Sequence, residues 1–477
     1  MNYRMVMMMI VVSLYAMHAY GQEKPIGYWQ TVDFVKNAED FKPGVQSLKE
    51  DPFIKDFRCF EAGTTSLGWT WSDGKITHTD GKTSAEYYIK SMDGGTYLFL
   101  PWLSGDVTLR GRIPMYYVFR KVSDDPMTKG TSTIDQSSIE EIKPVTGVDE
   151  YADVRWKDMS ALDLSGRAGL TASLNFNEKS VWPQADRMPP GLTPKELMAA
   201  AKNPGLGVRD LHGKEITGKG VRVAIIDQPL FPGHPEYAGK IAEYHDVGCG
   251  TETSMHGPAV ASLLAGVNCG TAPDVTIYYV AAPSWTRDAA HQAMALDWII
   301  DRNDSLPRSE KIRVVSVSAA PSGAGSLFVS NHNMWDEVCA RAEAKGIMVL
   351  DCTAHHGFIG PCYYDASDPE NIASCTPGFP GRSGRANPSK LLVPCSPRTT
   401  AEEYTRGDFT YQYCGQGGLS WSIPYCAGVL ALGWQLRPDL TPKQMREMLF
   451  QSAHVTGDGA KIINPGAFIR LVKAGQI

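Results

Sequence analysis

The hydrophobic pattern of the chain changes near residue 218, where short apolar runs begin to alternate with stretches of helical periodicity. Continuous β-branched and apolar runs separated by helices predict a parallel sheet that helices cover on both faces. Catalytic and ligand-binding groups are then expected at the carboxyl ends of the strands. The apolar runs are 221–226, 275–281, 314–318 and 347–350, and the helical stretches are 258–264, 289–300 and 335–345.

Residues 22–122 follow a different pattern, with short aromatic and β-branched runs bounded by Gly and Asp. The turn sequence Met92-Asp93-Gly94-Gly95 between two such runs predicts a β-hairpin. The stretches 27–29, 69–71 and 104–112 resemble a lipocalin-like module of exported bacterial proteins. The resemblance implies a small β-barrel. It is either packed by its own side chains, Trp29, Trp69, Trp71 and Trp102 among them, or holds a small ligand.

Residues 123–195 are mixed in character. Ser, Thr, Asp and Gly are frequent over 123–137, which indicates a linker. Near the end of the segment, Thr193 followed by Pro194 and Glu196 predicts a capped helix start. We therefore predict a barrel domain over 22–122, an intermediate segment over 123–195 and an α/β domain over 196–477.

The N-terminus has the pattern of a targeting segment. Arg4 precedes an apolar run over 5–16, and Ala19-Tyr20-Gly21 provides small residues for cleavage. The run is shorter than the ~20 residues that a membrane span needs. We predict a signal peptide over 1–21 and a protein that is exported, to the periplasm or beyond the cell, with no membrane span.

Charge and cysteine content narrow the range of functions. The chain has 46 Lys and Arg against 52 Asp and Glu, a net charge of −6. Proteins that hold nucleic acid through its phosphates are normally basic, so we expect no nucleic-acid partner. Ten cysteines in 477 residues are too few for a disulfide scaffold.

Three local motifs carry the candidate chemistry. Asp227 ends the first apolar run, His256 opens a helix of small residues, and Ser420 stands at another helix start within 418–428. A serine hydroxyl is a poor nucleophile and needs a base within hydrogen-bond reach. A histidine can supply that base, and a carboxylate can fix its tautomer.

The order Asp, His, Ser and the three motifs resemble the subtilisin-like serine proteases over about residues 200–465. The resemblance implies a three-layer domain with a mainly parallel sheet. It also implies an endopeptidase in which Asp227, His256 and Ser420 form the triad and an acyl-enzyme is the intermediate. The partner is then a protein or peptide substrate.

The chain also departs from the pattern of that family. Gln228-Pro229 follows the Asp, and Leu419 and Trp421 flank the Ser. His355 falls where the family has an asparagine that donates to the oxyanion; an imidazole N–H can donate as well, with activity that then depends on pH. Residues Ser318, Ala319 and Ala320 match the strand that lines the substrate.

These departures leave other functions open. One is a catalytically impaired pseudoprotease that binds or senses, and another places the principal function in the N-terminal barrel. The neighbouring His355 and His356 lack a third spaced ligand in the sequence, so we predict no metal site. We expect no required cofactor. Structural calcium occurs in the family, but no segment here demands it.

Overall fold

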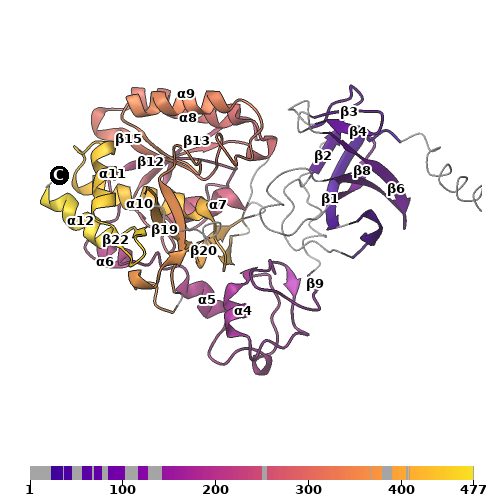
Figure 1. Cartoon of the computed structure of the whole chain (residues 1–477), viewed down its shortest axis with the longest axis horizontal. Coiled ribbons are helices and arrows are strands. Elements are labelled where there is room, and N and C mark those ends of the chain that lie inside the picture. The colour runs from indigo at the N-terminus through magenta and orange to yellow at the C-terminus, as the bar shows by residue number, and fades with distance from the viewer. Residues whose placement is uncertain are drawn as a thin grey trace, which may run out of the picture. The chain divides into compact units, whose positions relative to one another are not determined.

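The computed structural model describes residues 23–475 except 36, 46–55, 67–68, 78–83, 102–115, 127–141, 250–254, 366, 379–388, 404–406 and 408. The predicted signal peptide and the stretch 104–112 lie outside the described residues. The chain divides into two compact units, Met1–Thr131 and Ser132–Ile477 (Figure 1). Within the described residues, no helix combines the length and apolar character needed to cross a bilayer.

The first unit is built of antiparallel strands. One sheet has the order β2-β1-β8-β7-β6 and a second has the order β3-β4-β5. Asp93 and Gly94 both have positive φ, 45° and 75°, in the two-residue turn between β6 and β7, which confirms the predicted hairpin. The strands are β1 (Gly27–Val35), β2 (Asp56–Cys59), β3 (Thr70–Ser72), β4 (Lys75–Thr77), β5 (Ser84–Glu86), β6 (Tyr88–Met92), β7 (Gly95–Pro101) and β8 (Tyr116–Ser123).

The second unit contains the predicted parallel sheet, with the order β13-β14-β12-β15-β16. Its central strand shows why the run is apolar over residues 223–226. Val223 and Ile225 join the core beneath one face, whereas Ala224 and Ile226 join the core beneath the other. The strands are β12 (Arg222–Asp227), β13 (Ile241–Asp246), β14 (Thr276–Ala281), β15 (Ile312–Val317) and β16 (Met348–Leu350).

Helices cover both faces of this sheet (Figure 1). The core on one face includes α7 (His256–Ala265) and α10 (Leu419–Leu436), and the core on the other includes α8 (Ala289–Ser305) and α9 (His332–Ala344). The three layers predicted for this part of the chain are therefore present. They leave the carboxyl ends of β12, β15 and β16 at one edge of the sheet, as in other parallel sheets.

Smaller elements complete the unit. A further sheet has the order β18-β17-β19-β23-β22, and the predicted helix start at Thr193 is confirmed, since its side chain accepts a hydrogen bond from Glu196 N. The other strands are β9 (Lys143–Pro144), β10 (Lys157–Asp158), β17 (Ile359–Tyr363), β18 (Thr376–Pro377), β19 (Leu391–Ser396), β22 (His454–Val455) and β23 (Lys461–Ile462). The other helices are α4 (Ala168–Ser173), α5 (Pro194–Ala200), α6 (Val208–His212), α11 (Pro442–Gln451) and α12 (Pro465–Ala474).

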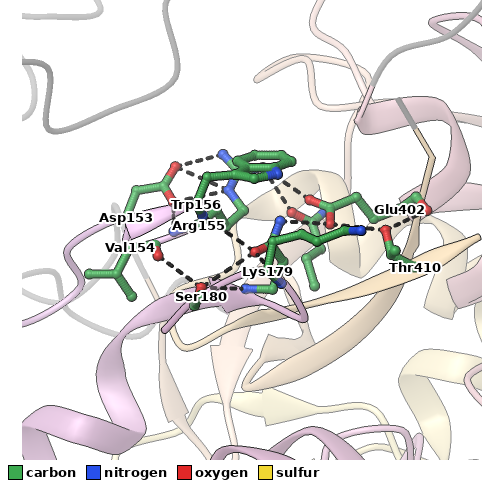
Figure 2. A network of polar contacts seen from close by, with 10 residues as sticks. Asp153, Val154, Arg155, Trp156, Lys179, Ser180, Glu402 and Thr410 are labelled. Carbon is green, nitrogen blue, oxygen red and sulfur yellow. Dashed lines mark hydrogen bonds and ion pairs between the residues drawn. The ribbon is translucent and has the colours of Figure 1, made fainter. Parts of the chain in front are cut away.

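The intermediate segment is joined to the rest of the unit by a strand and by buried charges. Its strand β11 (Asn175–Asn177) pairs with β21 (Thr410–Cys414), which in turn pairs with β20 (Arg398–Glu402). Figure 2 shows the polar network beside them. The Arg155 guanidinium contacts Asp153 at 2.6 Å and Glu402 at 3.8 Å, and Asn177 Nδ2 donates to Glu402 Oε2 at 3.0 Å. The side chain of Glu402 is fully buried, so its charge depends on these partners.

Replacing Arg155 with Met is expected to lower the free energy of unfolding by about 3 kcal/mol, because Asp153 and the buried Glu402 then lose a cationic partner. Adding Glu402→Gln should recover much of that loss, and urea unfolding of the two variants measures both. The control is Arg437→Met, which breaks a solvent-screened pair with Asp439 and should change the free energy of unfolding little. Equal losses in Arg155→Met and Arg437→Met would contradict a structural role for the buried network.

Candidate active site

The predicted Asp and His are adjacent in the structure. Asp227 is the last residue of β12 and His256 is the first residue of α7. Asp227 Oδ1 lies 2.6 Å from His256 Nδ1 and also accepts the backbone N–H of Gln228 at 2.8 Å. The Asp227 side chain is 4% exposed and that of His256 is 23% exposed. The carboxylate is thus buried and oriented, while the imidazole keeps an accessible edge.

This pair changes the acid–base behaviour of the imidazole. Burial disfavours the imidazolium, but the charge and the hydrogen bond of Asp227 outweigh burial and raise the pKa of His256. Because the folded pKa is above the unfolded value of ~6.5, this pair stabilises the fold fully below that pH. The stabilisation is lost as the pH rises through the folded pKa. A neutral base at His256 is populated only above the same raised pKa.

Gly257 lets α7 begin close to the strand end that carries Asp227. A Cβ at this position would lie 2.6 Å from Tyr279 Oη, 2.7 Å from Pro229 O and closer still to Gln228 O. Two of these atoms belong to the backbone and cannot rotate away. A glycine is therefore needed here for packing.

We expect Gly257→Ala to lower the free energy of unfolding by roughly 1–3 kcal/mol, because the overpacked Cβ must push α7 away from Asp227. The displacement should also lower any activity that depends on the Asp227–His256 contact. Thermal unfolding measures the first effect. The control is Gly466→Ala in α12, where the nearest atoms to a new Cβ lie 3.5 Å away and no loss is expected.

Ser420 is the second residue of α10, after the N-cap Gly418. Pro424, within the same helix, has no N–H to give to the carbonyl four residues earlier, which is that of Ser420. Ser318 Oγ donates to this carbonyl at 2.8 Å, and Ser420 Oγ in turn donates to Ser318 O at 3.2 Å. Because of the proline, the carbonyl oxygen of Ser420 is available to accept the hydrogen bond from Ser318, which connects the start of α10 to the end of β15.

The start of α10 also lies against the start of α7. The rings of His256 and Trp421 have centroids 5.1 Å apart, and Trp421 directly follows Ser420. The carboxyl ends of β12 and β15 and the first turns of α7 and α10 thus lie close together. The sequence marked Trp421 only as a departure from the family pattern, and nothing in it identified this ring as a contact of the histidine.

The other predicted residues hold defined positions. Ala319 O accepts the backbone N–H of Cys352 at 2.9 Å, and Ala320 O accepts Ser326 Oγ at 2.6 Å. His355 lies beyond β16, where its Nε2 is 3.2 Å from Asp336 Oδ1. Asp336 belongs to α9, and its carboxylate also accepts Ser322 Oγ at 2.6 Å. The sequence carried no signal for Asp336, because a single acidic residue on a helix is usually only solvated.

Three properties of the arrangement bear on its chemistry. The buried carboxylate holds an imidazole in one tautomer, and a serine hydroxyl lies on the neighbouring helix. The first turn of α10 leaves backbone N–H groups without intrahelical partners, which favours an anion near Ser420. One strand end and two helix starts carry these groups, which favours a fixed geometry.

Comparison with known proteins finds similarity to one protease family. Residues 218–375 match the model of the Subtilase family. Serine protease AprX of Bacillus subtilis (strain 168) is 25% identical over 281 residues, which are 50% of this chain and 62% of that protein. Subtilisin-like protease PopC of Myxococcus xanthus is 22% identical over 298 residues, 54% of this chain and 62% of PopC. The match thus spans about three fifths of each relative.

Solved structures with matching chains include the A-subunit of the AB5 toxin from E. coli, with a TM-score of 0.45, 15% identity and coverage of 57% of this chain and 98% of that one. Fervidolysin from Fervidobacterium pennivorans has a TM-score of 0.43 and 17% identity, and covers 56% of this chain and 45% of its own. The match of residues 218–375 to the Subtilase family model and the similarity to the two curated proteases agree with the order of the strands and motifs: this part of the chain is similar to the subtilases.

Proposed function

We propose that the chain is a serine endopeptidase that hydrolyses peptide bonds through an acyl-enzyme. The observation that carries the proposal is the 2.6 Å contact between Asp227 and His256, at a helix start that packs against the start of α10. A buried carboxylate on Nδ1 leaves Nε2 of the imidazole to act as the base. The subtilase family domain supports the same reaction class.

In the proposed reaction, His256 takes the proton of Ser420 as Oγ attacks the scissile carbonyl, and later gives it to the leaving amine. Asp227 holds the tautomer and stabilises the imidazolium without becoming protonated itself. Ser420 Oγ, which donates to Ser318 O in the free protein, must turn toward His256 first. Such contacts often tighten only when substrate binds.

Two groups are proposed for the oxyanion. One is the backbone N–H of Ser420 at the start of α10, where the helix favours negative charge. The other is His355, by its position in the sequence. Its Nε2 is bonded to Asp336 in the free protein, so donation to the oxyanion would require the other ring nitrogen or a turn of the ring.

Ser318, Ala319 and Ala320 remain the proposed contact for the substrate backbone. They continue from the end of β15 beside Ser420, and two of them have the smallest side chain other than glycine, which allows an extended peptide to approach. The sequence preference of the substrate depends on side-chain pockets that these three residues do not define.

Labelling with a fluorophosphonate tests the proposal, since this reagent reacts with activated serines. We expect labelling at Ser420, located by peptide mapping, that rises with pH as His256 loses its proton. Ser420→Ala should abolish it. Absence of labelling in folded protein at every pH from about 5 to 9 would favour the second candidate, a binding or sensing protein that retains the fold. That candidate is favoured by the engagement of His355 with Asp336.

We also propose that residues 22–122 form a lipocalin-like barrel and that the protein is exported. Buried aromatic side chains, including Trp29, Phe57 and Phe119, support a β-rich unit whose interior is apolar. A small lipophilic ligand in that interior would quench the fluorescence of Trp29. The proposal of export rests on the sequence of residues 1–21 alone.

A further inference from the structure

Three metal-ligating side chains converge at the end of the parallel sheet, on the side of α9. Asp336 lies in α9, and His355 and His356 lie in the turn after β16. One ligand atom of each residue lies within 4.8 Å of one ligand atom of the other two. The helix thus provides the third, separately spaced ligand that the adjacent histidines lack in the sequence.

The distances among these atoms suit a small transition-metal ion. Asp336 Oδ1 lies 3.2 Å from His355 Nε2 and 3.5 Å from His356 Nε2. Ligands bound at about 2.0–2.1 Å around a tetrahedral ion lie roughly 3.3–3.4 Å from one another. An ion could therefore bind between these atoms with little movement of the carboxylate or the rings.

The surroundings of the cluster resemble the outer shell of a metal site. His356 Nδ1, the nitrogen opposite the cluster, lies 3.5 Å from Asp351 Oδ2. Asp351 is itself buried and accepts Trp335 Nε1 at 3.0 Å and Thr353 Oγ1 at 2.7 Å. A carboxylate on the second nitrogen of a histidine fixes its tautomer and orients the ring toward a metal.

The ligands are both held and accessible. Ser322 Oγ donates to Asp336 Oδ1 at 2.6 Å, and a Cβ on Gly323 would lie 2.5 Å from His355 Nδ1, so the backbone packs closely against that ring. The side chains of Asp336, His355 and His356 are 43%, 42% and 31% exposed, which gives an ion a path from solvent.

We propose that Asp336, His355 and His356 bind a divalent transition-metal ion of the zinc type, with Asp351 as the outer partner of His356. Imidazole nitrogen is a borderline ligand, so two imidazoles beside a single carboxylate suit Zn²⁺ better than Ca²⁺ or Mg²⁺. Three protein ligands leave a fourth position for water. The ion would hold α9 to the turn after β16, and its binding does not depend on peptidase activity.

The test is titration of the full chain, free of polyhistidine tag and stripped with a chelator, with Zn²⁺ by calorimetry and with Co²⁺ by visible absorption. We expect one Zn²⁺ per chain and a tetrahedral Co²⁺ spectrum. Asp336→Asn and His356→Gln should each weaken Zn²⁺ binding at least ~10-fold, and Asp351→Asn about 10–100-fold. Excess Ca²⁺ should not compete.

The control is His454→Gln, which removes a histidine of β22 outside the cluster and should leave Zn²⁺ binding unchanged. Circular dichroism of each variant separates loss of a ligand from loss of the fold. Because the Asp336 side chain is partly exposed to solvent, Asp336→Asn is the variant expected to disturb the fold least. Equal Zn²⁺ affinity in wild type and Asp336→Asn, or an octahedral Co²⁺ spectrum, would overturn the proposal.

Discussion

Replacing Ser420 with Ala is expected to lower kcat for peptide hydrolysis by a factor of ~10⁶. The variant loses the nucleophile, so no acyl-enzyme forms and His256 has no hydroxyl to activate. Binding and the oxyanion site remain and account for the residual rate. Steady-state cleavage of a peptide with a chromogenic leaving group measures the effect. The Asp227–His256 contact should survive, since no atom of Ser420 takes part in it.

The matched control is Ser422→Ala, two residues further along the same helix. Ser422 is fully buried, and its Oγ donates to Val393 O at 2.8 Å, away from the contacts of Ser420. Removing that hydroxyl should cost ~1 kcal/mol of stability and leave kcat nearly unchanged. If Ser420→Ala were no more harmful to turnover than Ser422→Ala, Ser420 would not be the nucleophile.

Asp227→Asn is expected to lower kcat by ~10⁴, because the amide presents the wrong partner to Nδ1 and favours the wrong tautomer of His256. It should also change the pH profile. The charge of Asp227 contributes to the raised pKa of His256, so its removal lowers that pKa. The acid limb of kcat/KM should then move to lower pH while the plateau falls.

Asp246→Asn is the control for that experiment. Asp246 ends β13 and Asp227 ends β12, and both pair with Ala281 of the strand between them. The carboxylate of Asp246 accepts the backbone N–H groups of Gly248 and Cys249, each at 2.7 Å. Its loss should leave both kcat and the pH profile unchanged. A parallel shift in the two variants would assign the effect to general electrostatics instead.

The parts of the fold that the sequence predicts well are those set by local patterns. After Arg222 at its start, strand β12 is apolar because it is buried on both faces, and the apolar run ends at Asp227. The hairpin turn at Asp93-Gly94 and the capped helix at Thr193 are likewise encoded by neighbouring residues. In the same way, the motifs at the end of a strand and the start of a helix predicted that Asp227 and His256 lie next to each other, as they do in the structure.

Contacts between distant segments could not be predicted in this way. Asn177 and Glu402 are 225 residues apart, and neither lies in a pattern that points to the other. The cluster of Asp336 with His355 and His356 depends on which face of α9 meets the turn after β16, a matter of helix packing. Because the histidines alone lack a third ligand, the sequence predicted no metal there, and the proposed site departs from that prediction.

The pairing of β11 with β21 bears on where the second unit can be truncated. β21 lies between β11 and β20, so a chain that begins after β11 would leave β21 as an open edge of its sheet. Unpaired N–H and C=O groups on such an edge invite pairing with other molecules. The same cut would remove Arg155 from the buried Glu402. A truncated second unit that starts at residue 196 would therefore tend to aggregate, whereas one that keeps residues from 143 onward retains β11, which pairs with this edge.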